Sequence, residues 1–260
     1  MDEMLSKGIS FSLYMTHGGT SFGHWAGANS PGFQPDVTSY DYDAPINEWG
    51  LATPKYFELR KMMSKYTDGK KLPAVPKAPM SLISVPTFQL NEYRPLSNGI
   101  TGEKESNKPL SFEDMDMGWG TMVYTTTLPE IKAGATLTGE FHDFAQVYVN
   151  GKYVGKIDRV KNEKSLDLPA AAAGSEMTIV VEGMGRINFG RAIKDFKGLV
   201  GDVTLTADVD GDELTWNLKD WRMRRIADDY QTARRAMTTP RNDLALASNT
   251  PSAIGYYKAT

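Results

Sequence analysis

The segment QVYVNGKYVGKI, residues 146–157, carries the clearest structural signal in the chain. Two runs with alternating apolar residues flank Asn150-Gly151, and Asn-Gly between such runs is the strongest short-range signal for a β-hairpin. Helical periodicity is scarce around it, whereas further short segments rich in β-branched and aromatic residues follow at intervals. These segments are 122–128, 177–182 and 202–206. The pattern predicts a mainly β chain with an antiparallel β-sandwich over residues 87–215.

The segments on either side of this sandwich differ in composition. Residues 67–86 are rich in lysine and proline, which is typical of a linker. Beyond Trp216 the alternation weakens, and residues 254–257 resemble an opening strand with no partner after it. We therefore expect residues 216–260 to be the incomplete start of a second β-sandwich domain.

The amino-terminal segment predicts one strand, one long loop and one helix. Residues 11–15 alternate as a buried strand does and lead into a glycine turn. Thr53-Pro54 is a favourable helix start, and apolar side chains then recur at helical spacing to about Tyr66. This order is the repeating unit of a (β/α)8 TIM barrel, so residues 1–66 predict the last unit of such a barrel.

A single strand and helix cannot hold together alone in water. The strand needs neighbours on both edges, and the helix needs a sheet to cover. We expect these neighbours on sequence outside the chain, so that both ends are cut and a missing barrel segment of the same protein is a partner. The alternative is that residues 1–66 dock on the sandwich as a structural fragment.

The composition excludes several classes of function. The chain has 29 Lys and Arg against 32 Asp and Glu, so its charge does not indicate a nucleic-acid partner. The basic run 222–225 is interpreted as solvated surface. Cysteine is absent, which removes disulfides, thiolate zinc ligands and thiol nucleophiles. No apolar run is long enough to predict a membrane span, and the first residues lack a signal-peptide pattern.

The loop between strand and helix contains most of the candidate site residues. Aromatic rings beside carboxylates suit sugars, although buried aromatics more commonly fill space beneath a loop. These candidates are Trp25, Phe33, Asp36, Tyr40, Asp41, Tyr42 and Asp43. Asp41 and Asp43 could be proposed as a catalytic carboxylate pair, but Asp in a turn-rich loop more often bonds nearby backbone N–H groups. We therefore do not predict that this pair is catalytic.

The histidines predict no metal site. His17, His24 and His142 are the only ones, and their spacing matches no metal-binding motif. Structural roles are expected for all three. We predict neither a metal nor a cofactor.

Six quoted segments resemble one family of enzymes. The first block comprises LYMTHGGTSFG (13–23), GAN (27–29), TSYDYDAP (38–45) and KYFELR (55–60), and the second VVEGMGRINFG (180–190) and IKDFKGL (193–199). They closely resemble the glycoside hydrolase family 35 β-galactosidases, over most of the chain. In that family the first block is the last strand, loop and helix of the catalytic barrel. The second resembles its first all-β domain, a sandwich like galactose-binding jelly rolls.

The resemblance implies retaining removal of terminal, non-reducing β-D-galactose from an oligosaccharide or glycoconjugate. Two glutamates on earlier barrel strands would be acid/base and nucleophile, and those strands are absent here, so the chain alone should be inactive. Tyr42 is implied to donate its hydroxyl to the galactose, with Tyr40, Asp41 and Asp43 as loop supports. Residues 47–49, Asn-Glu-Trp, depart slightly from the family pattern. A bacterial periplasmic or secreted parent protein is favoured.

The sandwich leaves a second function open. A stand-alone carbohydrate-binding module without catalysis would need exposed aromatic side chains along a groove of the sandwich itself. Trp119 and Tyr124 are the aromatics to examine, with core packing as the more common role for each.

Overall fold

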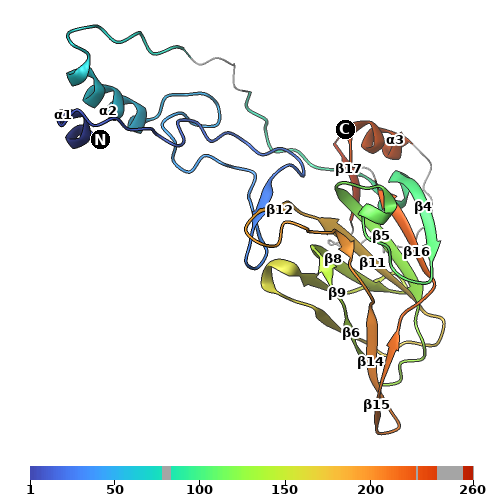
Figure 1. The fold of residues 1–260 in the computed structure, drawn as a ribbon. Coiled ribbons are helices and arrows are strands. Elements are labelled where there is room, and N and C mark those ends of the chain that lie inside the picture. Colours follow the sequence, from blue (N-terminus) through green and yellow to red (C-terminus); the bar gives the residue numbers. More distant parts are fainter. Residues whose placement is uncertain (78–82, 227, 239–253, 260) are drawn as a thin grey trace. The chain divides into compact units, whose positions relative to one another are not determined.

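The computed structural model describes residues 1–77, 83–226, 228–238 and 254–259 (Figure 1). Its contacts divide the chain into two compact units. Unit 1 comprises residues 1–26 and 37–86, and unit 2 comprises residues 27–36 and 87–260. The chain therefore leaves unit 1 for a short segment and returns to it before the main body of unit 2 begins.

Unit 2 is built on a six-stranded antiparallel sheet with strand order β4-β16-β5-β11-β8-β9 (Figure 1). Its strands are β4 (Ile100–Ser106), β16 (Trp221–Ile226), β5 (Gly120–Thr127), β11 (Glu176–Gly183), β8 (Phe144–Val149) and β9 (Lys152–Asp158). Strand β11 pairs with β5 along its whole length and with β8 along most of it. The centre of the sheet is therefore its most regular part.

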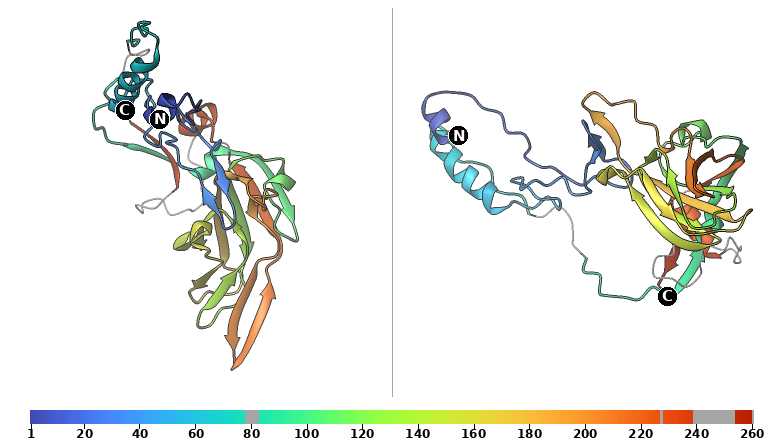
Figure 2. Two further views of the ribbon diagram at one scale, coloured as in Figure 1. Left: turned by 60° about the vertical axis from the view of Figure 1, so that its left-hand side comes forward. Right: turned by 90° about the horizontal axis from the view of Figure 1, so that it is seen from below.

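A four-stranded sheet packs against it, as two further sides of the molecule show (Figure 2). The strand order is β10-β6-β14-β15, with β10 (Ser165–Leu168), β6 (Ala135–Thr138), β14 (Thr204–Val209) and β15 (Asp212–Asn217). Leu137 and Leu205 of this sheet share one buried cluster with Tyr124, Val147 and Ile179 of the larger sheet. The apolar faces of both sheets thus form one core, as in a β-sandwich.

Smaller elements close the edges of unit 2. Strand β13 (Gly198–Leu199) pairs with β7 (Phe141–His142), and β17 (Gly255–Lys258) pairs with β3 (Glu92–Pro95). Helix α3 (Tyr230–Thr238) and the 3-10 helices η2 (Leu96–Gly99), η3 (Glu113–Met115) and η4 (Arg159–Lys161) complete it. A second apolar cluster joins Leu96, Val123 and Tyr148, so the six-stranded sheet is covered on part of its outer face as well.

The segment 27–36, which we call the arm, adds a strand from the amino-terminal part of the chain to unit 2. Strand β1 (Gly27–Asn29) pairs in parallel with β12 (Arg186–Phe189), and β2 (Gln34–Pro35) folds back on β1. Ala28, Phe33 and Ile187 form a separate buried cluster there.

The predicted hairpin is confirmed. Strands β8 and β9 are joined at Asn150-Gly151, with φ of 48° and 73° at the two residues, as the tight turn of a hairpin requires. The predicted strands at 122–128 and 177–182 correspond to β5 and β11, whereas the one at 202–206 begins later, at Thr204.

The segment after Trp216 differs from the expectation of a separate domain. Residues 221–226 form β16, which pairs with β4 and β5 inside the same sheet. Its alternation was hidden because the outward positions are arginines, Arg222 and Arg224, in ion pairs with Glu103 and Glu105 of β4. Residues 254–257 also have a partner, since β17 pairs with β3. Residues 239–253 lie outside the described part of the chain.

Unit 1 contains α1 (Asp2–Ser6), α2 (Pro54–Met63) and η1 (Ser64–Tyr66). Thr53 caps α2 by accepting a hydrogen bond from the backbone N–H of Tyr56, and Pro54 occupies the first turn, as predicted. The apolar stripe of α2 is only half-buried, and no residue of the helix is fully buried. No described helix of the chain is long and apolar enough to cross a membrane.

The buried strand predicted at 11–15 is not formed in this structure. Those residues have no strand hydrogen bonding, and Tyr14 is 86% exposed. A strand forms only where a neighbouring edge pairs with it, and no described segment pairs with residues 11–15.

Candidate functional site

A hollow of about 490 Å³ lies in unit 1, beside Tyr42. Its walls come from residues 13–15, from residues 40–45 and from Lys55 and Leu59 of α2. Residues 37–52, which we call the Tyr42 loop, thus meet the helix that follows them in sequence. The hollow combines apolar, phenolic, carboxylate and ammonium groups, a mixture that suits a small polar ligand with C–H faces.

Tyr42 presents its side chain to solvent at this hollow. The residue is 72% exposed, and its ring meets that of Tyr40 edge to face at 5.0 Å. Its φ of 45° places the backbone in the left-handed region, which turns the chain sharply between Asp41 and Asp43. The turn therefore directs the phenol of Tyr42 toward solvent.

Asp41 and Asp43 both have partners within unit 1. Oδ1 of Asp41 accepts a hydrogen bond from the backbone N–H of Ala44 at 3.1 Å. Oδ2 of Asp43 forms an ion pair with Nζ of Lys55 at 2.5 Å, which ties the turn to α2. These contacts are the loop-supporting role that we expected.

Glu48 is a further loop support that the sequence patterns did not identify. It accepts hydrogen bonds from the hydroxyls of Ser39 and of Thr20, the latter at 2.7 Å. These two bonds lower the pKa of the Glu48 carboxyl below its ordinary value, so the group stays ionised. The only signal in the sequence was the departure at 47–49 from the family pattern.

The aromatic candidates of the amino-terminal loop are divided between the two units. Tyr40 and Tyr42 belong to unit 1, as does Trp25, whereas Phe33 and Asp36 belong to unit 2. Phe33 is almost fully buried there, at 8% exposed. The sequence therefore grouped side chains that belong to two different units of the structure.

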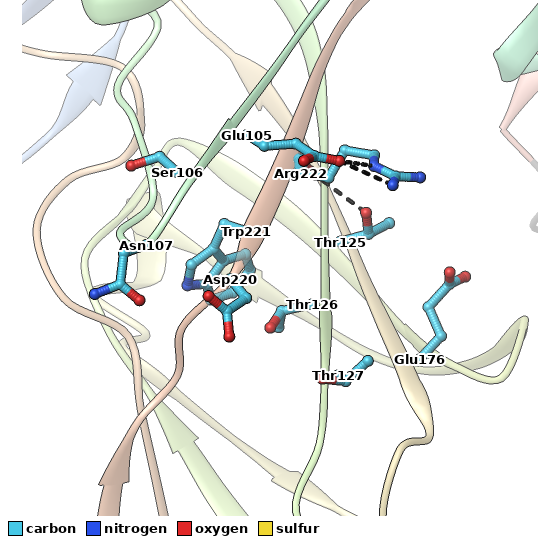
Figure 3. Close-up of a pocket in the computed structure, with 10 residues that line it drawn as sticks. All are labelled: Glu105, Ser106, Asn107, Thr125, Thr126, Thr127, Glu176, Asp220, Trp221 and Arg222. Atoms are coloured by element: carbon cyan, nitrogen blue, oxygen red, sulfur yellow. Dashed lines mark hydrogen bonds and ion pairs between the residues drawn. The ribbon is translucent and has the colours of Figure 1, made fainter.

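Unit 2 has a hollow of its own, of about 550 Å³, on the six-stranded sheet (Figure 3). Its lining is mainly polar and includes three threonines, 125–127, and the ion pair between Arg222 and Glu105 at 2.9 Å. Trp221 is its one aromatic residue and is completely buried, with its indole N–H donating to the backbone oxygen of Leu218. This hollow lacks the exposed aromatic surface that a carbohydrate-binding module would need.

Tyr124 is a core residue. It is fully buried, its hydroxyl donates to the backbone oxygen of Leu110 at 2.9 Å, and it accepts from the N–H of Leu199 at 3.2 Å. Burial raises the pKa of this phenol. Trp119 is half-exposed and lies next to the start of β5. Core packing, the more common role, is thus confirmed for Tyr124.

Four charged side chains meet inside unit 2, and we call them the ion cluster: Asp143, Arg159, Asp195 and Lys197. Nζ of Lys197 lies 2.6 Å from Asp143 and 2.8 Å from Asp195. One guanidinium nitrogen of Arg159 lies 2.6 Å and 2.8 Å from the same two carboxylates. Two cations and two anions balance, so the cluster can remain charged although it is buried.

The pKa of Asp195, a member of the cluster, and the pKa of the neighbouring His142 are both lowered. Burial acts to raise the pKa of Asp195, but the hydrogen bonds and charges of Lys197 and Arg159 outweigh it and lower that pKa. Burial lowers the pKa of His142, whose Nδ1 lies 2.6 Å from the backbone oxygen of Phe196. His142 is thus a structural histidine with a neutral ring. The described residues contain no group of three His, Cys, Asp or Glu that could hold a metal ion.

Two family models match this chain. Residues 1–66 match the glycosyl hydrolases family 35, and residues 109–226 match the β-galactosidase first all-β domain. The chain belongs to glycosyl hydrolase family 35. Its relatives include β-galactosidases of Bos taurus and Homo sapiens, each 37% identical across 80% of the chain, and one of Xanthomonas manihotis, 35% identical across 82%.

The family 35 chain is much shorter than these relatives. It spans 33% of the bovine, 31% of the human and 36% of the Xanthomonas protein, about a third of their length. A similarity to the apo form of Pleurotus ostreatus lectin, 16% identical with a TM-score of 0.32, covers 48% of this chain and 36% of the lectin. A similarity at that level carries no information on function.

The hollow and the ion cluster of this family 35 chain lie in different matched regions. Tyr42 and the hollow beside it lie in the part that matches the family 35 model, while the ion cluster lies in the all-β part. The arm belongs to the first region by sequence and to unit 2 by contacts.

Proposed function

We propose that this chain is part of a β-galactosidase, a retaining glycoside hydrolase that removes terminal, non-reducing β-D-galactose. The observation that carries the proposal is that the hollow beside Tyr42 lies within the segment that matches family 35, in a chain whose relatives are named β-galactosidases. In this proposal the chain supplies one wall of the sugar pocket, and a galactose-containing oligosaccharide or glycoconjugate is the substrate.

Tyr42 is the proposed galactose contact. Its exposed ring stands at the mouth of a hollow lined by polar groups, and a phenol can donate one hydrogen bond to a sugar hydroxyl. The edge-to-face contact with Tyr40 and the ion pair between Asp43 and Lys55 restrict the turn that carries it. A restrained donor loses less entropy when the sugar binds.

The two catalytic carboxyl groups are proposed to lie on barrel strands outside this chain. Retaining hydrolysis needs an acid/base and a nucleophile roughly 5–5.5 Å apart. The carboxylates of the Tyr42 loop have other partners: Asp41 bonds Ala44, and Asp43 bonds Lys55. Glu48 is held by two hydroxyls, which keep it ionised and so unsuited to donating a proton.

The domain organisation is proposed on the same basis. Residues 1–66 would be the last strand, loop and helix of a TIM barrel, joined by the linker 67–86 to a jelly-roll, galactose-binding-like sandwich. The exposure of Tyr14 and of Leu13 supports this, because both would be covered by neighbouring barrel strands. Strand β16 extends the sandwich to residue 226, beyond the boundary at 215 that the sequence predicted.

Hydrolysis of a chromogenic β-galactoside tests the proposal. The 260-residue chain should show no turnover, whereas the full-length protein should hydrolyse the substrate. Tyr42→Phe in the full-length protein should raise KM by roughly tenfold, about the value of one lost hydrogen bond. Tyr230→Phe, at a similarly exposed tyrosine of unit 2, is the matched control and should leave both constants unchanged.

Two outcomes would overturn the proposal. An inactive full-length protein would reject β-galactosidase activity. Turnover by the 260-residue chain that Tyr42→Phe weakens but does not abolish would show that the catalytic groups are present within it.

A further inference from the structure

The arm is attached to unit 2 by its backbone. Gly27 and Ala28 pair in parallel with Arg186 and Ile187 of β12, and the N–H of Ser30 donates to the oxygen of Phe189 at 3.0 Å. The Ser30 hydroxyl donates to the same oxygen, also at 3.0 Å. A three-residue strand with these few bonds would not hold a flexible loop by itself.

Phe33 supplies the side-chain attachment. The centroid of its ring lies 4.2 Å from Cζ of Arg159 and 4.7 Å from Nζ of Lys197. The ring also packs in the buried cluster with Ala28 and Ile187. Cations within about 6 Å of an aromatic face are attracted by it, more strongly where water is excluded. Phe33 thus joins apolar packing to contact with two cations.

The ion cluster fixes the two cations that Phe33 meets. The carboxylates of Asp143 and Asp195 each contact both Arg159 and Lys197, so neither cation can move alone without losing two ion pairs. Asp143 is itself fixed, because it accepts a hydrogen bond from the backbone N–H of Met184 at 2.7 Å. The surface that receives the ring is therefore held by four ion pairs and a hydrogen bond.

The arm continues directly into the Tyr42 loop. Unit 2 holds the chain up to Asp36, and unit 1 resumes at Val37. The first hydrogen bonds of the returning chain follow at once: the N–H of Ser21 donates to the oxygen of Thr38, and the N–H of Tyr40 donates to the oxygen of Gly19. Releasing the arm would free the amino-terminal end of the segment that leads to Tyr42.

We propose that Phe33 is a positioning residue for galactose binding: docked on the ion cluster, it fixes the arm and thereby restrains the Tyr42 loop. The effect on galactose binding rests on the proposed function. The restraint of the Tyr42 loop does not. Phe33 does not touch the sugar and acts only through the chain that leads to Tyr42.

Hydrogen exchange of the full-length protein tests the restraint without relying on its activity. In Phe33→Ala, amides of residues 37–44 should exchange at least ~10-fold faster, because release of the arm opens the loop locally. Phe33→Leu keeps apolar packing but loses both cation contacts. Its exchange rates should lie between those of the wild type and of Phe33→Ala. Phe189→Ala is the matched control: Phe189 lies in β12 against the arm, but its side chain is 70% exposed, so exchange should not change.

Galactoside kinetics of the full-length protein test the consequence. Phe33→Ala should raise KM at least ~5-fold with kcat within ~2-fold, since uniform substrate binding is lost. Phe33→Leu should recover part of that change, and Phe189→Ala should match the wild type. Thermal unfolding of each variant checks that unit 2 remains folded.

The outcomes separate the two proposals. An inactive wild-type protein rejects the β-galactosidase assignment, while the exchange experiment still decides on the restraint. Unchanged exchange in residues 37–44 of a folded Phe33→Ala protein overturns the positioning role. In the full-length Phe33→Ala variant, a lower kcat with an unchanged KM overturns it as well.

Discussion

Nζ of Lys197 lies 2.6 Å from Oδ2 of Asp143, and neither side chain is more than 1% exposed. A pair this deeply buried would be costly alone, because both charges lose their hydration. Arg159 and Asp195 complete a neutral group of four, and backbone groups add hydrogen bonds to it. The cluster therefore depends on all of its members being present.

Asp143→Asn should lower the free energy of unfolding of unit 2 by about 3–5 kcal/mol, because it leaves a buried positive charge uncompensated. Asp202→Asn is the matched control, since Asp202 forms only an exposed pair with Lys108 at 3.5 Å and should change stability by less than about 0.5 kcal/mol. Urea unfolding followed by tryptophan fluorescence measures both. Equal effects of the two substitutions would contradict a balanced cluster.

Acidification should destabilise unit 2 through His142. Burial lowers the pKa of His142, and the ring faces Glu140, Asp195 and Arg159. Because the folded-state pKa lies below the unfolded value of about 6.5, the unfolded chain binds more protons between the two values. Stability should fall as pH decreases below about 6.5, by at most about 1.4 kcal/mol per pH unit for one group.

Urea midpoints at a series of pH values measure this slope. His142→Asn can still donate to the oxygen of Phe196 but cannot take up a proton, so its profile should be flatter over the same range. A wild-type profile no steeper than that of His142→Asn would show that another group is responsible.

Tyr124→Phe should cost unit 2 about 1–3 kcal/mol, because it leaves the backbone N–H of Leu199 and the oxygen of Leu110 without the hydroxyl. Tyr153→Phe serves for comparison. The Tyr153 ring is partly exposed, so loss of its hydroxyl should leave the free energy of unfolding nearly unchanged. Urea unfolding with an unchanged m-value is the expected observation. A neutral Tyr124→Phe would mean that these groups find other partners.

Glu48→Ala should loosen the Tyr42 loop, since it removes the acceptor shared by Thr20 and Ser39. Amides of residues 37–52 should exchange several-fold faster by hydrogen exchange. The pKa of Glu48 is lowered by these bonds, so they persist above the ordinary glutamate value of about 4.3 and are lost only as pH falls through the lower folded-state value. Glu58→Ala, on the exposed side of α2, should leave this exchange unchanged.

The sandwich was predictable wherever local chemistry decides the structure. Asn150-Gly151 requires left-handed backbone that suits a tight hairpin, and the flanking strands alternate strongly, so position and type were both correct. Strand β16 was missed because Arg222 and Arg224 are stabilised by Glu103 and Glu105 of a strand far away in sequence. Periodicity within one segment cannot reveal a partner that makes charged residues acceptable in a sheet.

The candidate site was predictable only in part. The turn-forming roles of Asp41 and Asp43 follow from residue type and local spacing. Phe33 belongs to unit 2 and contacts cations at positions 159 and 197, which no local pattern connects to residue 33. The position of Tyr42 as a galactose contact stays a prediction.

The backbone N–H and the hydroxyl of Ser30 both donate to the backbone oxygen of Phe189, a residue 159 positions later in the chain. During synthesis the early strand must wait for its late partner, and closing so long a loop costs entropy before any contact is gained. Unit 2 is consequently not a continuous stretch of sequence. A recombinant piece that begins at residue 87 would leave an unfilled slot along Ile187, where Ala28 and Phe33 belong.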